Sequence, residues 1–267
     1  MHLSMHNWMR AEPLEVTVRR LARYGYESIE ISGEPDQYDT AEVSRILKEN
    51  RIRCWGAVTL MLDGHEMTIV PGEVGVVVPA STPEVEWGWA VEGMKEIYDH
   101  AQQAGVRLAV EPLNRFETYF VSRADQALAL AEATGPECGV CLDAFHLNIE
   151  DADPFQAILD VGDRLVDFHV ADTNRLACGM GHWDWARVVE TLKQAGYDGA
   201  LTVEFVAPID RTPANPFPDA LETEPVDISE EQRKFIEDHG SDLLSEAFYD
   251  SLVAKTAETI LPLIGRS

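Results

Sequence analysis

Four short apolar runs in the second half of the chain each end at a residue that can bind a metal ion. The runs are Arg107-Leu-Ala-Val-Glu111, Gly139-Val-Cys-Leu-Asp143, Leu165-Val-Asp-Phe-His169 and Ala200-Leu-Thr-Val-Glu204. Helix-like segments separate them, so the order strand, ligand, helix is repeated. In a parallel α/β barrel the carboxyl ends of the strands form one rim, where catalytic groups gather. The pattern therefore predicts that three carboxylates and one imidazole converge on one divalent metal ion.

The predicted metal ligands are Glu111, Asp143, His169 and Glu204. A donor set dominated by oxygen suits Mn²⁺, Mg²⁺ or Co²⁺ better than a thiolate-rich zinc site would. We expect one divalent cation, with Mn²⁺ favoured and Mg²⁺ or Co²⁺ as alternatives. Each ligand alone has an ordinary explanation, because an acid at a strand end can also cap the helix that follows. Four of them at four strand ends favour the metal.

Four more residues with polar or aromatic side chains follow these ligands in the sequence: Glu117, His146, Arg175 and Trp183. A carboxylate, an imidazole, a guanidinium and an indole together suit a small polyhydroxylated ligand. Gly179 and Gly181 precede Trp183, and glycine-rich turns allow a backbone to approach a ligand closely. As alternatives, Glu117 pairs with Arg115 or Arg123, and the indole belongs to the core.

The composition narrows the class of protein. The 267 residues, 45% of them hydrophobic, suit one barrel domain that spans 1–267. The net charge of -26 argues against nucleic acid and anionic membranes as partners. The N-terminus lacks the features of a signal peptide, and there is no apolar run of about 18 residues for a membrane span. Four cysteines do not make a disulfide framework, so we expect a cytoplasmic protein.

Eight strands and the helices between them can be placed from the pattern. Gly25, Gly105 and Gly196 precede apolar runs and fit the left-handed residue that closes a helix. Thr82-Pro83 fits the start of a long helix that ends near Gln103. The strands are expected near residues 3–8, 27–32, 53–60, 66–71, 107–111, 139–143, 165–170 and 200–205.

Two segments depart from a regular barrel. Only residues 61–65 separate the third and fourth predicted strands, whereas a parallel crossover needs about 10–12 residues. Either these two strands are not parallel neighbours, or the helix between them is absent from the sequence, which we favour. Residues 209–240 are acidic and rich in proline, and we expect them to form a long irregular loop before a final helix at about 241–263.

Several motifs resemble those of the ketose 3-epimerases of the D-tagatose/D-psicose group, which belong to the xylose isomerase-like TIM barrels. Glu111-Pro-Leu-Asn-Arg-Phe-Glu117 is similar to their E-x-x-N-R-[FY]-E motif, and Asp143-Ala-Phe-His-Leu-Asn148 is similar to D-x-F-H-M-N. The segment from His169 to Arg175, followed by Gly179-Met-Gly181, resembles H-[IV]-x-x-T-N-R with G-x-G after it. The resemblance implies a TIM barrel and a metal-dependent sugar isomerase or epimerase.

The resemblance also implies roles for individual residues. Glu111 and Glu204 would act as the catalytic acid and base as well as metal ligands. Glu117, His146 and Arg175 would hold sugar hydroxyls. Proton transfer next to a ketose carbonyl would then pass through an enediolate whose negative charge a cation stabilises. A small sugar is the expected substrate, and a homo-oligomer the expected assembly.

The resemblance weakens after the last predicted ligand, where the chain reads Glu204-Phe-Val-Ala-Pro208 instead of the Glu-Pro-Phe of the epimerases. This region is similar to catalytic subunits of C-glycoside deglycosidases, which cleave a carbon–carbon bond in 3-oxo-glycosides together with a small second subunit. That lyase activity in a hetero-oligomer is the main alternative. A nuclease is disfavoured by the acidic charge, and a non-catalytic sugar-binding protein by the retention of both glutamates.

Overall fold

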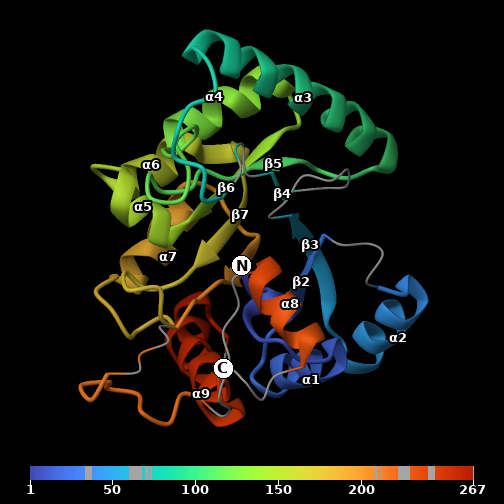
Figure 1. Ribbon diagram of the computed structural model, residues 1–267, viewed down its shortest axis with the longest axis vertical. Coiled ribbons are helices and arrows are strands. Elements are labelled where there is room, and N and C mark those ends of the chain that lie inside the picture. The colour runs from blue at the N-terminus through green and yellow to red at the C-terminus, as the bar shows by residue number, and fades with distance from the viewer. Residues whose placement is uncertain are drawn as a thin grey trace.

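The computed structural model describes residues 1–33, 38–59, 68–69, 72, 74–207, 210, 212–221, 229–239 and 244–266. Their strands form one parallel sheet in the order β1-β8-β7-β6-β5-β4-β3-β2 (Figure 1). The strands are β1 (His2–Met5), β2 (Ser28–Ser32), β3 (Arg53–Thr59), β4 (Thr68–Ile69), β5 (Ala109–Val110), β6 (Gly139–Asp143), β7 (Leu165–Val170) and β8 (Ala200–Val203).

The two edge strands of this sheet, β1 and β2, lie next to each other and close it into a barrel. The backbone N–H of Glu27 donates to Leu3 O at 3.0 Å, and His6 and Glu30 form a parallel bridge. Every residue of β1, β2, β6 and β8 is buried, as expected for strands covered on both faces. The predicted TIM barrel is confirmed.

Helices follow the strands on the outside of this barrel (Figure 1). The longest, α3, begins at the predicted Thr82-Pro83 pair, although the Thr82 side chain makes no capping hydrogen bond. Gly25, Gly105 and Gly196 have positive φ angles of 81°, 71° and 81°, which confirms their predicted role in closing helices. The helices are α1 (Leu14–Arg23), α2 (Thr40–Asn50), α3 (Pro83–Ala104), α4 (Ala124–Thr134), α5 (Ala144–Glu150), α6 (Pro154–Val161), α7 (Trp185–Gln194), α8 (Glu230–His239) and α9 (Glu246–Ile260), with short 3-10 turns η1 (Asn7–Met9), η3 (Gly162–Arg164) and η4 (Leu261–Ile264).

The strands β3 and β4 are parallel neighbours, with Val58 opposite Thr68. The first alternative, that these strands are not neighbours, is therefore wrong. Residues 60–67, which connect them, lie outside the described residues, and so does the predicted absence of a helix there. The strand expected near 66–71 is described only at Thr68–Ile69.

The expectation of a loop throughout 209–240 is wrong for the residues of α8. The sequence Ser229-Glu-Glu-Gln232 forms a capping box at the start of this helix. The backbone N–H of Gln232 donates to Ser229 Oγ, and that of Ser229 donates to Gln232 Oε1, both at 3.1 Å. Such a box satisfies two backbone groups that a helix start leaves unpaired, so it was the signal for a helix. The final helix, expected at about 241–263, is α9.

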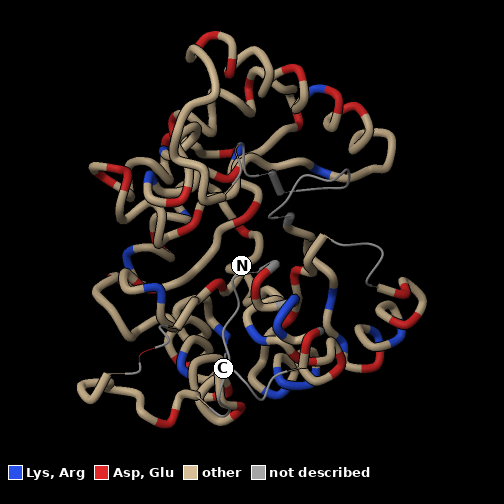
Figure 2. Tube along the Cα trace, viewed as in Figure 1, with Lys and Arg blue, Asp and Glu red and all other residues tan. Residues whose placement is uncertain are grey.

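The distribution of Asp and Glu residues and the polarity of the helices both agree with the acidic amino-acid composition. Asp and Glu residues lie on helices and loops throughout the molecule rather than in one patch (Figure 2). Across the described part of the chain, helices are too short or too polar to cross a lipid bilayer.

A buried ionic cluster connects α1 to α9. The side chains of Arg20 and Glu12 are only 4% and 3% exposed and pair with each other. The guanidinium of Arg20 also lies 3.3 Å from Asp250 Oδ1 and 4.8 Å from the ring centroid of Tyr249, both on α9. These contacts attach the last helix of the chain to the first.

We predict that Arg20→Ala lowers the free energy of unfolding by about 3 kcal/mol, because the substitution leaves the Glu12 carboxylate buried beside fewer positive charges. The neighbouring Arg19 is 67% exposed and pairs with Glu15. Arg19→Ala should therefore cost about 0.5 kcal/mol or less. Urea unfolding of both variants measures the difference, and equal effects would show that the buried pair contributes nothing beyond an exposed one.

Candidate metal centre and active site

The barrel brings the four predicted metal ligands together. Each lies at or just after the carboxyl end of its strand, β5, β6, β7 or β8, and these strands are consecutive neighbours in the sheet. Asp143 pairs with His169 in the register of β6 and β7, and the backbone N–H of Glu204 donates to Val170 O. All four side chains are buried, and one donor atom from each lies within 4.8 Å of the others: Glu111, Asp143, His169 and Glu204.

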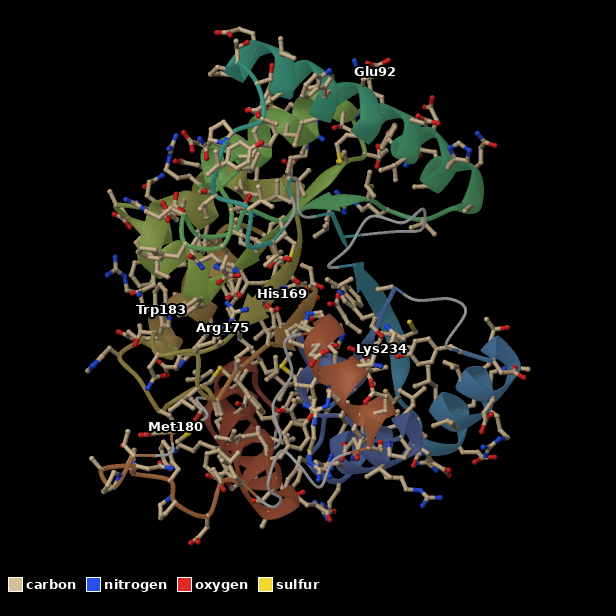
Figure 3. All side chains as sticks on the ribbon, in the orientation of Figure 1. Glu92, His169, Arg175, Met180, Trp183 and Lys234 are labelled. Carbon is tan, nitrogen blue, oxygen red and sulfur yellow. The ribbon has the colours of Figure 1, made fainter. Side chains whose placement is uncertain are left out.

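The imidazole of His169 contacts the two glutamates directly. Its Nδ1 lies 3.0 Å from Glu111 Oε1 and 3.2 Å from Glu204 Oε2. Arg175 comes from the loop after β7 and approaches the same group, near His169 in Figure 3. Its Nη1 lies 2.9 Å from Asp143 Oδ2 and its Nη2 lies 3.3 Å from Glu204 Oε1. The guanidinium thus offsets part of the negative charge of three buried carboxylates.

The environment shifts the pKa values of these carboxyl groups in opposite directions. Burial raises the pKa of Glu111, and burial raises the pKa of Asp143 to about 8 although Arg175 opposes the shift. Burial also disfavours the charged form of Glu204, but the attraction of Arg175 and His169 outweighs burial and leaves its pKa well below the usual value. Groups with opposed shifts are suited to serve as an acid and a base in one reaction.

The donor set fits a divalent cation. Mg²⁺ holds oxygen ligands at about 2.0–2.1 Å, so donors on opposite sides of the ion are about 4.2 Å apart, which agrees with the spacing of the group. Three carboxylates buried together are unfavourable unless positive charge compensates them. A cation would supply that charge, and three oxygens with one nitrogen are ligands that Mg²⁺, Mn²⁺ and Co²⁺ accept.

Asp143 has two roles, because its two oxygens point to different partners. Its Oδ1 accepts from the backbone N–H of Phe145 at 2.7 Å and caps α5, whereas its Oδ2 faces Arg175. The ordinary explanation for an acid at a strand end is therefore correct here, and it does not exclude a metal. The guanidinium of Arg175 is fixed over the Phe145 ring, at 4.6 Å from its centroid.

The predicted substrate-binding residues Glu117, His146 and Arg175 belong to one hydrogen-bonded group. Asn114, which had not been singled out, connects them. Its Nδ2 donates to Glu117 Oε1 at 2.6 Å and lies 2.9 Å from His146 Nδ1. On the other side of the ring, His146 Nε2 lies 3.4 Å from Arg175 Nη1. The alternative partners of Glu117 are engaged elsewhere, since Arg115 pairs with Glu150 and Arg123 pairs with Asp125.

Trp183 contacts other aromatic residues. Its ring lies 5.7 Å from that of Phe155 and 6.3 Å from that of Trp185, and it is labelled apart from His169 in Figure 3. A role for Trp183 in substrate binding stays a prediction.

The glycine-rich turn before Trp183 has a local structural cause. A Cβ atom at Gly181 would lie 2.2 Å from Asp172 Oδ1. Asp172 accepts hydrogen bonds from the backbone of Gly179 and Trp183 and from the indole of Trp185. The glycine therefore makes room for the carboxylate that fixes this turn, and close approach of a ligand is not needed to explain it.

Three further buried polar residues, which the sequence analysis missed, lie beneath the ligands: His6, Glu30 and Asp167. The Nε2 atoms of His6 and His169 lie 3.3 and 3.5 Å from Glu30 Oε2. Burial lowers the pKa of His6 to about 4, so its ring is neutral near pH 7. A signal was present, because single acids within buried strands, as in Ile29-Glu-Ile31, are rare unless they have partners.

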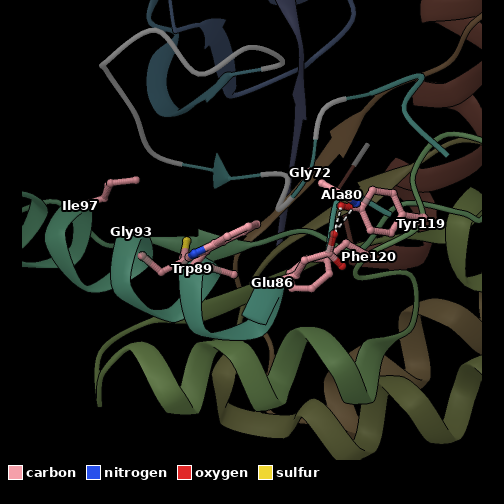
Figure 4. A pocket seen from close by; sticks show the side chains of 10 residues that line it. Gly72, Ala80, Glu86, Trp89, Gly93, Ile97, Tyr119 and Phe120 are labelled. Atoms are coloured by element: carbon pink, nitrogen blue, oxygen red, sulfur yellow. Dashed lines mark hydrogen bonds between the residues drawn. The ribbon is translucent and has the colours of Figure 1, made fainter. Parts of the chain in front are cut away.

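A separate cavity of about 310 Å³ lies along α3 (Figure 4). Glu86 lies at one side of it and accepts hydrogen bonds from the backbone of Ala80 and Ser81 and from Tyr119 Oη. These bonds fix the start of α3. The four candidate ligands are not among the residues that line this cavity, so it is distinct from the candidate metal centre.

Comparisons with known proteins agree with this architecture. The family described as "Xylose isomerase-like TIM barrel" matches residues 57–239. The chain is 34% identical over 116 residues to a D-psicose 3-epimerase of Enterocloster bolteae, which is 43% of this chain and 38% of that protein. It is 28% identical over 214 residues to an L-ribulose 3-epimerase of Methylomonas sp., which is 68% of this chain and 75% of that protein. The first of these matches thus spans well under half of the relative's length.

Solved structures show the same fold at low sequence identity. A D-allulose 3-epimerase from Methylomonas sp. has a TM-score of 0.75 and 22% identity, with 98% of both chains covered. A D-psicose 3-epimerase from Clostridium cellulolyticum has a TM-score of 0.74 and 19% identity, with 100% of both chains covered. None of these four proteins is a deglycosidase, so the lyase alternative gains no support from them.

We predict that a divalent cation stabilises the fold. At a free cation concentration of about 100 times the dissociation constant, the free energy of unfolding should rise by about 2.7 kcal/mol, and a chelator should reverse the rise. Asp143→Asn should lose most of this effect, whereas Asp125→Asn, whose side chain is 70% exposed, should keep it. Thermal unfolding with Mg²⁺, Mn²⁺ and Co²⁺ in turn measures the response. No response to any of the three would argue against the metal centre.

Proposed function

Because the chain belongs to the xylose isomerase-like TIM barrel family, we propose that it is a divalent-metal-dependent sugar epimerase or isomerase that transfers a proton next to a ketose carbonyl. One observation carries the proposal: Glu111 and Glu204 both contact Nδ1 of His169, and their pKa values are shifted in opposite directions. The names of the relatives, which include D-psicose and L-ribulose 3-epimerases, support a free ketose as substrate.

The two glutamates divide the proton transfer between them. Glu204, whose pKa is lowered, is ionised and accepts the proton from the carbon next to the carbonyl. Glu111, which contacts the same imidazole nitrogen and whose pKa is raised by burial, is the partner that returns a proton to that carbon. A cation bound by Glu111, Asp143, His169 and Glu204 would supply the positive charge that stabilises the developing oxyanion.

The neighbouring polar group binds and orients the sugar. Glu117 accepts from Asn114 and keeps a second carboxylate oxygen for a sugar hydroxyl, while Arg175 supplies N–H donors at the edge of the acid cluster. Burial and the charge of Arg175 keep the pKa of His146 low, so its ring is a neutral partner for hydroxyls. Trp183 would offer an apolar surface farther out.

Three finer features belong to the same proposal. Mn²⁺ is the ion we propose, with Mg²⁺ and Co²⁺ as alternatives, because the donor set suits all three. Assembly as a homo-oligomer and a cytoplasmic location stay predictions that follow from the resemblance and the composition.

The proposal predicts exchange of hydrogen between a ketose and the solvent. Mn²⁺-loaded protein incubated with a panel of ketohexoses in D₂O should incorporate deuterium at C3 of its substrate and form the C3 epimer, because the proton that Glu111 returns exchanges with the solvent. NMR of the sugar identifies both the position and the product. Absence of label in every ketose would contradict the proposal and direct attention to 3-oxo-glycosides.

Substitution of either glutamate tests the division of roles. Glu111→Gln and Glu204→Gln should each lower kcat by about 10²–10⁴-fold, because a general acid or base contributes that much, with a smaller change in sugar binding. Glu86→Gln is the matched control, since this glutamate is also buried but lies in the α3 cavity. Kinetics and binding of the sugar are measured separately. Equal losses of binding and turnover would exclude the acid and base roles.

A further inference from the structure

One buried acid outside the proposed ligand set lies between two histidines. Glu30 Oε2 is 3.3 Å from His6 Nε2 and 3.5 Å from His169 Nε2. The three side chains are at most 2% exposed, so water does not compete for these atoms. None of the three atoms has a hydrogen-bond partner within ordinary geometry. Because an unsatisfied buried polar atom is costly, small shifts that let them pair with one another are favoured.

Such pairing determines which nitrogen of His169 carries hydrogen. A carboxylate oxygen accepts hydrogen bonds, so both imidazoles must present an N–H at Nε2. In His169 this leaves a free lone pair on Nδ1, the atom that faces Glu111 Oε1 and Glu204 Oε2. A histidine that binds a metal must offer that lone pair, and the group at its other nitrogen sets the tautomer.

We propose that Glu30 is a positioning residue for the metal centre, which fixes the ring and the tautomer of His169 so that Nδ1 is directed at the cation. This inference rests on the proposed metal-dependent function. It assigns a role to β2, which contributes none of the four ligands.

The neighbouring acid Asp167 is less suited to this role because its oxygens are engaged. It accepts from the backbone N–H of Phe168 at 2.7 Å, from Trp55 Nε1 at 3.2 Å and from Thr202 Oγ1 at 3.2 Å. The ion pairs of His169 Nε2 include Glu30 but not Asp167 among the described residues. Glu30 is therefore the acceptor that remains for this nitrogen.

The backbone of β3 makes room for Glu30. The register between β2 and β3 shifts at this point, because Ile29 pairs with Cys54 but Glu30 pairs with Gly56. The shift is a β-bulge, a feature that often redirects side chains next to active sites. A Cβ atom at position 56 would lie 2.7 Å from Glu30 Oε1. A glycine at this position thus lets the carboxylate lie where both imidazoles reach it.

The test measures binding of the metal alone. Glu30→Gln should raise the dissociation constant for Mn²⁺ by about 10–100-fold, because an amide can donate as well as accept and no longer fixes the tautomer. The loss of the free Mn²⁺ signal in electron paramagnetic resonance gives this constant. Glu86→Gln, a buried acid at the α3 cavity, should bind Mn²⁺ as the unsubstituted protein does.

A second variant approaches the same contact from β3. Gly56→Ala should displace the Glu30 carboxylate and weaken Mn²⁺ binding in the same direction, whereas Gly88→Ala, where an added Cβ meets nothing within 4 Å, should not. In Mg²⁺-loaded protein, the ¹⁵N shifts of His169 should report hydrogen on Nε2, and Glu30→Gln should alter them. Unchanged Mn²⁺ binding in folded Glu30→Gln would overturn the proposal.

The result of the Mn²⁺-binding test does not depend on whether the protein turns over a sugar. If Mn²⁺ binds and depends on Glu30 but no ketose is turned over, the proposed reaction fails while the positioning role stands. If a ketose is epimerised and Mn²⁺ binding does not depend on Glu30, the positioning role fails alone.

Discussion

The rest of the site depends on the burial of three carboxylates at one end of the barrel. Parallel strands that are neighbours in the sheet end at the same rim, so acids at the ends of β5, β6 and β8 are forced close together. Such a group is tolerated only if positive charge is near, and Arg175 provides part of it. Arg175 in turn lies beside His146, which Asn114 contacts from the other side of the ring.

The clustering of the four candidate metal ligands could be predicted because each occupies the same place in a repeated local pattern. Glu111 and Glu204 directly follow their strands, and a parallel barrel places the ends of neighbouring strands at one rim. The contacts of Glu30 could not be predicted in the same way. They depend on a bulge in β3 and on the absence of a side chain at Gly56, and both arise from how strands distant in sequence pair.

Other differences have equally specific causes. The proline-rich composition of 209–240 predicts an irregular loop, and the capping box of α8 is a short signal within it. The helix is therefore easily missed in the sequence. The turn at Gly179 and Gly181 suggests a place for a ligand from its sequence, whereas the Asp172 side chain lies in the space beside Gly181 and the Thr259 side chain in the space beside Gly179. Composition and motif indicate that such segments matter, but neither shows the side-chain contacts that explain them.

The double role of Asp143 has a consequence for how this site can change during evolution. Loss of an N-cap costs about 0.5–2 kcal/mol, so substitutions at this position are selected against through the α5 cap even if the catalyst is no longer needed. In the described part of the chain, Glu111 and Glu204 cap no helix, so they lack this additional constraint. A descendant that retains the aspartate but has lost either glutamate would therefore be the expected form of an inactive lineage.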